Sequence, residues 1–153
     1  MGGLRLSEGS HCGRFSYAHQ SICVFPSPCE SDRWIALGEP HQGLDDSVTK
    51  RRPVTRPAET RIADGVACSV PETDALEIIW RHVARVVMVT DDEIATAMRI
   101  LFDDTHNVAE GAGAAALAAI LQERGQLSGK RVAAVLSGAN VDRDLYREVL
   151  GGV

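Results

Sequence analysis

A loop of small polar residues follows an apolar run near the end of the sequence. It consists of Ser137, Gly138, Ala139 and Asn140, and it comes directly after the apolar residues 132–136. The serine hydroxyl can donate or accept a hydrogen bond, and backbone amides that lead into a helix favour an anionic or polar ligand atom. The same residues also suit an ordinary turn, so the local pattern leaves both interpretations open.

Two other kinds of chemistry have weaker support. A zinc site would use histidine and cysteine side chains of the N-terminal region, which are His11, Cys12, His19, Cys23 and Cys29. These residues form no C-x-x-C or H-x-x-x-H pair, the spacings typical of zinc sites. The sequence also lacks the G-x-S-x-G motif on which a Ser/His/Asp hydrolase would rest.

Strands and helices are predicted on both sides of the loop. Residues 86–89 and 132–136 are short apolar runs, which are typical of strands buried on both faces. Thr90 and Glu93 fit a capping box, in which each side chain accepts a hydrogen bond from the other's backbone amide. The helix that follows should end near residues 105–107, and its apolar face carries Ile94, Ala97, Met98, Leu101 and Phe102.

Further elements are expected around these. Thr73 is predicted to cap a helix over 74–82, a buried helix should cover 112–124, and a last helix should cover 142–150. A short strand over 34–38 and an extended connector over 53–57 precede them. This order predicts an α/β fold with an open, mostly parallel sheet and flanking helices. Ligands of such sheets bind beyond the carboxyl ends of the strands, where the loop 137–140 lies.

The sequence divides near residue 58. Residues 1–58 hold three of the four cysteines and show no sustained helical or strand period, so we expect an irregular and mobile N-terminal segment there. Residues 59–153 carry the regular patterns and are expected to form the α/β part.

Charge and hydropathy exclude several classes of partner. Sixteen Lys and Arg against 21 Asp and Glu give a net charge of −5, so a nucleic-acid partner is not expected. The longest apolar run, over residues 111–121, is about half of the roughly 20 residues that a membrane span needs. No secretory signal is visible after Met1. We expect a cytoplasmic protein whose cysteines are thiols and which binds no membrane.

Five segments, read together, resemble a known family. They are E-T-R-I-A-D-G-V-A (59–67), A-L-E-I-I (75–79), V-V-M-V-T-D-D-E-I (86–94), V-A-E-G-A-G-A-A-A-L-A (108–118) and V-L-S-G-A-N-V-D (135–142). Their order and spacing resemble the C-terminal part of threonine dehydratase and its relatives, the serine/threonine ammonia-lyases and serine racemases. These are pyridoxal-phosphate enzymes of fold type II, related to tryptophan synthase β. The resemblance implies a partial fold type II domain and a small amino acid as substrate. The implied reaction removes the α-proton, expels the β-hydroxyl and releases a 2-oxo acid and ammonia.

The resemblance also implies cofactor-binding residues. Ser137 to Asn140 match the family's S-G-G-N loop, except that Ala139 replaces a glycine. In the family, the serine of this loop forms a hydrogen bond with the pyridine nitrogen of the cofactor. Glu110 matches the glutamate of V-E-P-[AS]-G-A, which lies near the cofactor. The other interpretation of Glu110 is a solvated carboxylate, which the dipole at a helix N-terminus stabilises.

Two weaker matches lie upstream. Gly2 and Gly3 resemble the end of the family's glycine-rich phosphate loop. Glu39, Asp45 and Asp46 resemble the family's E-P-x-x-A-D-D segment, which holds Mg²⁺ or Ca²⁺ through oxygen ligands. One extra residue separates Glu39 from the aspartates here, and three exposed loop carboxylates are the competing interpretation.

The lysine that the family's chemistry needs has no match in this sequence. The two lysines are Lys50 and Lys130, and neither stands in the family's S-x-K context. Two interpretations therefore stay open. The chain is the C-terminal portion of a dehydratase, functional only if the missing N-terminal half completes it, or it is a non-catalytic remnant or interaction domain. The expected macromolecular partner is that N-terminal half or, in a homo-oligomer, further copies of the chain. The sequence leaves three origins open, which are a truncation, a frameshifted product and a genuine short protein.

Overall fold

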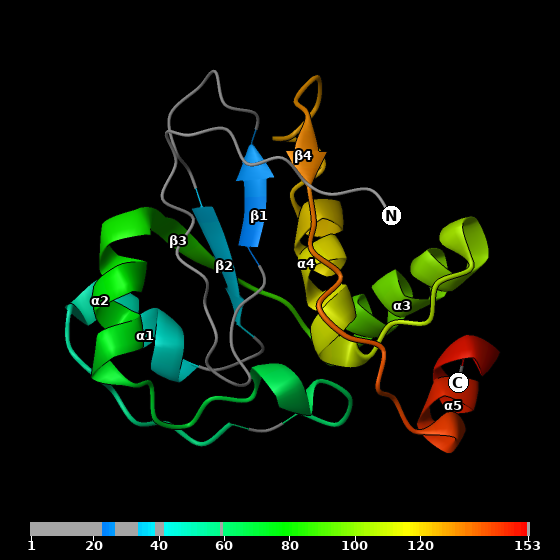
Figure 1. Cartoon of the computed structure of the whole chain (residues 1–153), viewed down its shortest axis with the longest axis horizontal. Helices are drawn as coiled ribbons and strands as arrows, with labels where there is room; N and C mark the ends of the chain where they lie inside the picture. The colour runs from blue at the N-terminus through cyan, green and yellow to red at the C-terminus, as the bar shows by residue number, and fades with distance from the viewer. Residues whose placement is uncertain (1–22, 27–33, 39–41, 59, 153) are drawn as a thin grey trace, which may run out of the picture.

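A computed structural model describes residues 23–26, 34–38, 42–58 and 60–152 of the chain. Its strands are β1 (Cys23–Pro26), β2 (Trp34–Gly38), β3 (Val83–Met88) and β4 (Val132–Ala133). Its helices are α1 (Gln42–Lys50), the 3-10 turn η1 (Asp64–Val66), α2 (Thr73–His82), α3 (Asp91–Thr105), α4 (Gly111–Gln122) and α5 (Arg143–Gly151). In Figure 1, α1 and α2 lie on one side of the strands and α3, α4 and α5 on the other. The arrangement is an α/β fold, as predicted.

The described strands form a mixed sheet in the order β3-β2-β1-β4. Strands β2 and β3 are parallel, whereas β1 is antiparallel to both β2 and β4. The prediction of a mostly parallel sheet is therefore wrong for these strands. The apolar runs that suggested it report burial on two faces, and burial does not specify strand direction.

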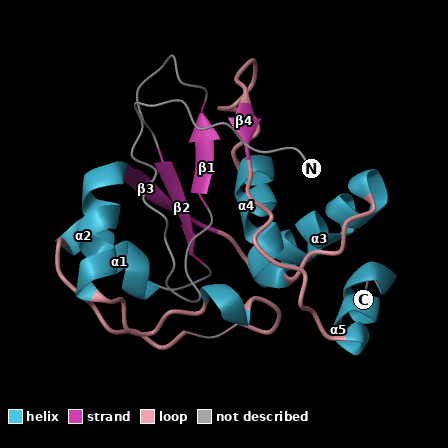
Figure 2. Cartoon of the chain, viewed as in Figure 1, coloured by secondary structure: helices cyan, strands magenta, loops and turns pink. Residues whose placement is uncertain are grey.

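Strand β4 is shorter than predicted. It covers two residues, Val132–Ala133, in place of the five expected, and the chain then runs as a loop to α5 (Figure 2). Val135 is 45% exposed and Leu136 is 39% exposed. An apolar run extends as a strand only where another strand satisfies its backbone, and β4 pairs with β1 through two residues. The prediction for residues 134–136 is therefore wrong in this structure.

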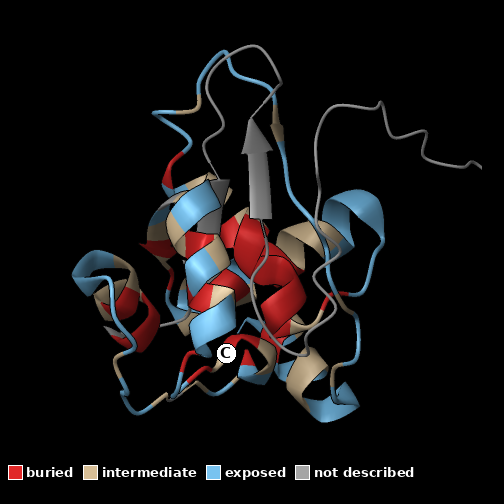
Figure 3. Cartoon of the chain, turned by 60° about the vertical axis from the view of Figure 1, so that its left-hand side comes forward, coloured by how far each residue is buried: buried red, intermediate tan, exposed pale blue. Residues whose placement is uncertain are grey.

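The core is built around α4. Eight of its residues, from Gly111 to Ala119, are buried, in agreement with the apolar pattern, and Figure 3 shows the buried residues gathered at the centre of the molecule. Ile94, Ala97 and Met98 of α3 pack against it. A second cluster joins Leu44 of α1 to Leu76 and Ile79 of α2. No helix in the described part of the chain is both long and apolar enough to cross a membrane.

Several local predictions can be compared with the structure. The capping box of Thr90 and Glu93 is confirmed, and α3 ends at Thr105 as expected. Helix α2 starts one residue early, so Thr73 is its first helical residue and Glu72 occupies the cap position without a side-chain hydrogen bond. The predicted strand over 34–38 is confirmed.

The N-terminal segment is more regular than expected. The structure places β1 and α1 within residues 1–58, where we predicted one short strand as the single regular element. Helix α1 was not predicted because most of its residues have low helix propensity: Gly43, two aspartates, a serine, a valine and a threonine. Leu44, Ser47 and Val48 nevertheless bring one face of α1 into the second core cluster and its surroundings.

Candidate functional site

The loop 137–140 lies against the N-terminal end of α4, and the contact is made through Glu110. The Glu110 amide donates a hydrogen bond to the carbonyl oxygen of Gly138 at 3.1 Å. The Asn140 amide donates in turn to the Glu110 carboxylate, also at 3.1 Å. The structure thus brings together Glu110 and the loop, two of the cofactor-binding elements that the sequence suggested. The Glu110 carboxylate is held by this bond and makes no hydrogen bond to the helix that it precedes.

Two glycines allow this close approach. A Cβ atom on Gly113 would lie 2.4 Å from the Gly138 carbonyl oxygen, and a Cβ on Gly138 would lie 2.3 Å from a Glu110 carboxylate oxygen. Real side chains do not tolerate such distances, so the helix and the loop can meet here because both residues lack a Cβ. We predicted a role for Gly138 from its place in the loop, whereas Gly113 was read as part of a buried helix.

A third segment, residues 60–65, completes the wall around Glu110. The Ile62 carbonyl oxygen lies 2.0 Å from the position that a Cβ atom on Gly111 would take. A Cβ atom on Gly65 would lie 2.9 Å from the Ala112 Cβ. Gly65 also approaches the Glu110 carboxylate, with 3.9 Å between its Cβ position and an oxygen. Gly111, which stands where the family has proline, is thus required here by backbone packing.

The loop offers polar atoms to solvent. Ser137, Ala139 and Asn140 are exposed, whereas Gly138 and Glu110 are half-buried. The Ser137 hydroxyl makes no side-chain hydrogen bond to the described part of the chain, so it is available to a ligand. This arrangement can present one neutral hydroxyl and a stretch of backbone to a flat polar ring, with a fixed carboxylate behind it.

Neither lysine approaches the loop. Lys130 is exposed and lies seven residues before Ser137, at the other end of β4 and the extended chain after it. Seven extended residues span roughly 20 Å. Lys50 ends α1 and forms an ion pair with Asp46, with 2.8 Å between nitrogen and oxygen. Within the described residues, the loop therefore has no lysine amine beside it with which to hold an aldehyde covalently.

Of the acidic residues proposed for a metal, Asp46 already has two cationic partners, Lys50 and Arg56. Asp45 and Asp46 lie in helix α1 and not in a loop, and Glu39 lies outside the described residues. Hydrogen bonds from Lys50 and Arg56 lower the pKa of Asp46. Among the residues that the structure describes, no group of three acidic, histidine or cysteine side chains is placed to bind a metal. The Mg²⁺ or Ca²⁺ site stays a prediction, as do the roles of Gly2 and Gly3 and the zinc alternative at residues 11–29, which fall outside the described side chains.

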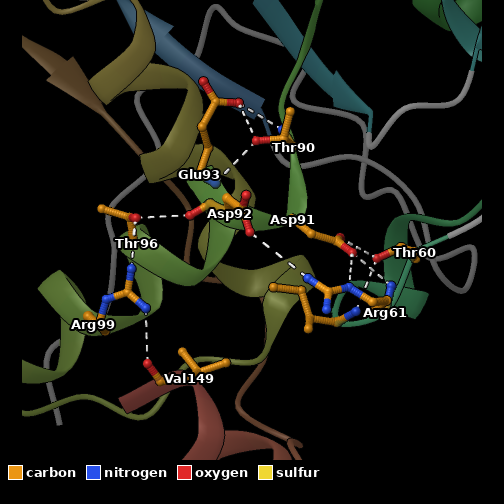
Figure 4. Close-up of polar contacts among 10 residues, drawn as sticks. Thr60, Arg61, Thr90, Asp91, Asp92, Glu93, Thr96, Arg99 and Val149 are labelled. Atoms are coloured by element: carbon orange, nitrogen blue, oxygen red, sulfur yellow. Dashed lines mark hydrogen bonds and ion pairs between the residues drawn. The ribbon is translucent and has the colours of Figure 1, made fainter. Parts of the chain in front are cut away.

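A polar cluster that the sequence did not single out lies beside segment 60–65 (Figure 4). The Thr60 hydroxyl donates to Asp91 at 2.7 Å, and the Arg61 amide donates to the other oxygen of the same carboxylate at 2.9 Å. An open hollow of about 510 Å³ is lined by residues of this cluster and its neighbours, which are Ala58, Thr60, Arg61, Asp64, Ala67 and Asp91. The loop 137–140 is not among the residues that line this hollow.

Comparisons with known proteins concern the family and the fold of this chain. A family model for pyridoxal-phosphate dependent enzymes matches residues 35–138, which is more than half of the chain. The chain is 43% identical over 97 residues to an L-threonine ammonia-lyase of Geobacter sulfurreducens, covering 63% of this chain and 24% of the relative. It is 37% identical over 89 residues to an L-threonine ammonia-lyase of Thermotoga maritima, covering 58% of this chain and 22% of the relative.

The fold of this chain is also similar to that of a solved structure. The processed form of threonine deaminase isoform 2 from Solanum lycopersicum matches with a TM-score of 0.66 and 26% identity, over 76% of this chain and 36% of that one. The chain thus spans about a quarter of the length of the curated relatives named above. The family match begins at residue 35, upstream of the segments that first suggested the resemblance. The chain belongs to the family of pyridoxal-phosphate dependent enzymes.

Proposed function

We propose that residues 59–153 form the C-terminal part of the cofactor-binding domain of a threonine or serine dehydratase. The observation that carries the proposal is the contact between Glu110 and the loop 137–140, because it joins two separate family segments at one site. In this proposal the complete domain has the fold type II arrangement with a mostly parallel sheet. The substrate is a small hydroxy amino acid, and the location is the cytoplasm. Residues 1–58 precede this part of the domain, and their elements β2 and α1 pair and pack with it.

The site fits one edge of pyridoxal phosphate. The exposed Ser137 hydroxyl would face the ring nitrogen, and the backbone of Gly138 and Ala139 would lie beside the ring. When bound, the cofactor withdraws electrons from the carbon atom at which the substrate loses its proton. A neutral hydroxyl at the ring nitrogen does not hold a proton there as an aspartate would, and this moderates the withdrawal in a way that suits elimination. Glu110 orients the loop by accepting from the Asn140 amide.

The isolated chain is expected to be inactive. A hydrogen bond from Ser137 contributes about 0.5–1.5 kcal/mol net, which is too little to hold the cofactor without a lysine bond and a phosphate cradle. We expect millimolar or undetectable binding of pyridoxal phosphate and no 2-oxobutanoate from threonine. Steady production of 2-oxobutanoate by the purified chain, abolished by Lys50→Ala, would contradict this expectation.

We further propose that a second polypeptide completes the domain. Val135 and Leu136 are apolar, exposed and directly ahead of the loop, and they belong to a run with the pattern of a strand buried on both faces. A strand contributed by the complementary part of a homologous enzyme would cover them and supply the lysine. The competing proposal, a non-catalytic interaction domain, is favoured by one observation: in the described part of the chain, no lysine lies near the loop.

Reconstitution separates the two proposals. The full chain is mixed with the N-terminal part of an L-threonine ammonia-lyase relative that carries the lysine, and 2-oxobutanoate production from threonine is measured. We expect activity in the mixture, a loss in Ser137→Ala, and little change in Lys130→Ala, the matched control at the far end of β4. Absence of activity with a folded complex favours the interaction domain. Equal losses in the two variants would mean that the loop has been placed at the wrong end of the sheet.

A further inference from the structure

The Asp91 carboxylate connects helix α3 to segment 60–65, which packs beside Glu110 of the candidate site. Asp91 is the first residue of α3, and its side chain is 19% exposed. One carboxylate oxygen accepts from the Thr60 hydroxyl at 2.7 Å and the other from the Arg61 amide at 2.9 Å, as Figure 4 shows. Hydrogen bonds to a charged acceptor are about twice as strong as neutral ones. Segment 60–61 is therefore fixed to the start of α3.

The Thr60 hydroxyl also shapes the chain that follows it. While it donates to Asp91, its oxygen accepts from the Ile62 amide at 3.2 Å and from the Ala63 amide at 2.9 Å. One donor and two acceptor positions are all that a hydroxyl has, so Thr60 is fully used. The bend at residues 60–63 thus depends on a side chain whose own direction is set by Asp91.

This bend places backbone directly against the first turn of α4. The Ile62 carbonyl oxygen and the Ala63 Cα lie 2.0 Å and 3.1 Å from the position of a Cβ on Gly111. Ala63 is 1% exposed, so the contact is inside the core. Close-packed interiors transmit displacements, and the residue before Gly111 is Glu110, which holds the loop.

We propose that Asp91 and Thr60 are positioning residues of the candidate cofactor site. They act through segment 60–65 on Glu110, and through Glu110 on the loop 137–140. That this site binds a cofactor rests on the proposed function, whereas the positioning role depends on the geometry of the chain alone. The hydrogen bonds of Asp91 and Thr60 described above join them to each other and to residues 61–63.

A purely structural role for Asp91 makes a different prediction. Its charge lies at the N-terminus of a helix, where a carboxylate is stabilising whatever else it contacts. It also faces Arg61, which is 75% exposed, at 3.6 Å. Asp92 carries the same charge at the next position but is 95% exposed and makes no hydrogen bond to Thr60. Asp92→Asn therefore removes one charge at the start of α3, together with its 3.9 Å ion pair to Arg61, and leaves the hydrogen bonds of Asp91 in place.

Amide hydrogen exchange on the full chain, without cofactor, tests the proposal. The variants are Thr60→Val and Asp91→Asn, and the matched controls are Thr60→Ser, which keeps the hydroxyl, and Asp92→Asn. The amides followed are those of Glu110 and Asn140, with Ala116 in the buried middle of α4 as the internal reference. In both variants we expect protection of Glu110 and Asn140 to fall roughly tenfold relative to Ala116. Both controls should stay within about twofold of the wild type.

The outcomes decide between the roles. An equal fall at all three amides, or the same selective fall in Asp92→Asn, would overturn the proposal in favour of general stabilisation. If Thr60→Val does not fold, Asp91→Asn serves as the test. Asparagine keeps one of the two acceptor oxygens of aspartate and therefore disturbs folding less. The exchange result does not depend on pyridoxal phosphate. A failed reconstitution together with a selective loss of protection would therefore reject the proposed function and keep the positioning role.

Discussion

Gly113→Ala should destabilise the protein although it places a better helix former inside a helix. The new Cβ would lie 2.4 Å from the Gly138 carbonyl oxygen and 3.2 Å from the Gly138 nitrogen. Alanine gains up to about 1 kcal/mol of helix propensity, whereas overpacking a core costs about 1–3 kcal/mol. Displacing the loop also weakens the hydrogen bond from Glu110 to Gly138, which is worth about 1 kcal/mol. The expected net loss in the free energy of unfolding is about 1–3 kcal/mol.

Urea unfolding of the full chain, followed by circular dichroism, measures this loss. The matched control is Gly151→Ala, because Gly151 is also helical and a Cβ there meets nothing within 4 Å. We expect the control to be as stable as the wild type or slightly more stable. In thermal unfolding, Gly113→Ala should melt several degrees lower, at about 2–4 °C per kcal/mol for a chain of this size. A Gly113→Ala variant that is as stable as the control would refute the close contact between α4 and the loop.

Three further predictions follow from side chains outside the loop. Thr90→Ala should cost about 1 kcal/mol, measured by urea unfolding, because it removes the cap of α3. Burial acts to raise the pKa of Glu93, but hydrogen bonds from Thr90 and Gln122 outweigh it and lower the pKa. The resulting stability is present above the ordinary value of about 4.5 and is lost as the pH falls through the lowered value, so Glu93→Gln should flatten the acid limb of the stability curve. An unchanged acid limb would contradict this. Tyr146→Phe should leave stability unchanged or raise it by up to about 1 kcal/mol, since the buried hydroxyl has no partner in the described structure. A loss above that size would show a missed partner.

Local patterns predicted the helices best. The capping box of Thr90 and Glu93 and the apolar surface of α4 each depend on residues a few positions apart, which the sequence displays directly. The strands were harder, because pairing needs a partner from elsewhere in the chain. Residues 132–136 have the composition of one buried strand. In the described sheet, however, Val132 and Ala133 are the two that pair, because β1 reaches these two residues.

For the candidate site too, some properties follow from the sequence and others from the tertiary structure. The sequence by itself determined which residues are available for chemistry, including the loop 137–140, Glu110 and the lack of a third lysine. It also determined the resemblance to pyridoxal-phosphate enzymes, which the family match bears out. These properties are carried by residue type and by spacing along the chain.

Only the tertiary structure decided which of these residues are in contact. Gly113 was one small residue in a buried helix until the fold placed the Gly138 carbonyl against it. Thr60 and Asp91 lie far apart in the sequence, and no local pattern marks them as partners. Their contact, and the wall that it supports, exist because two helices and a turn bury their apolar faces together. Such burial depends on the total shape of the packed surfaces, and the order of residues within any one element does not reveal that shape.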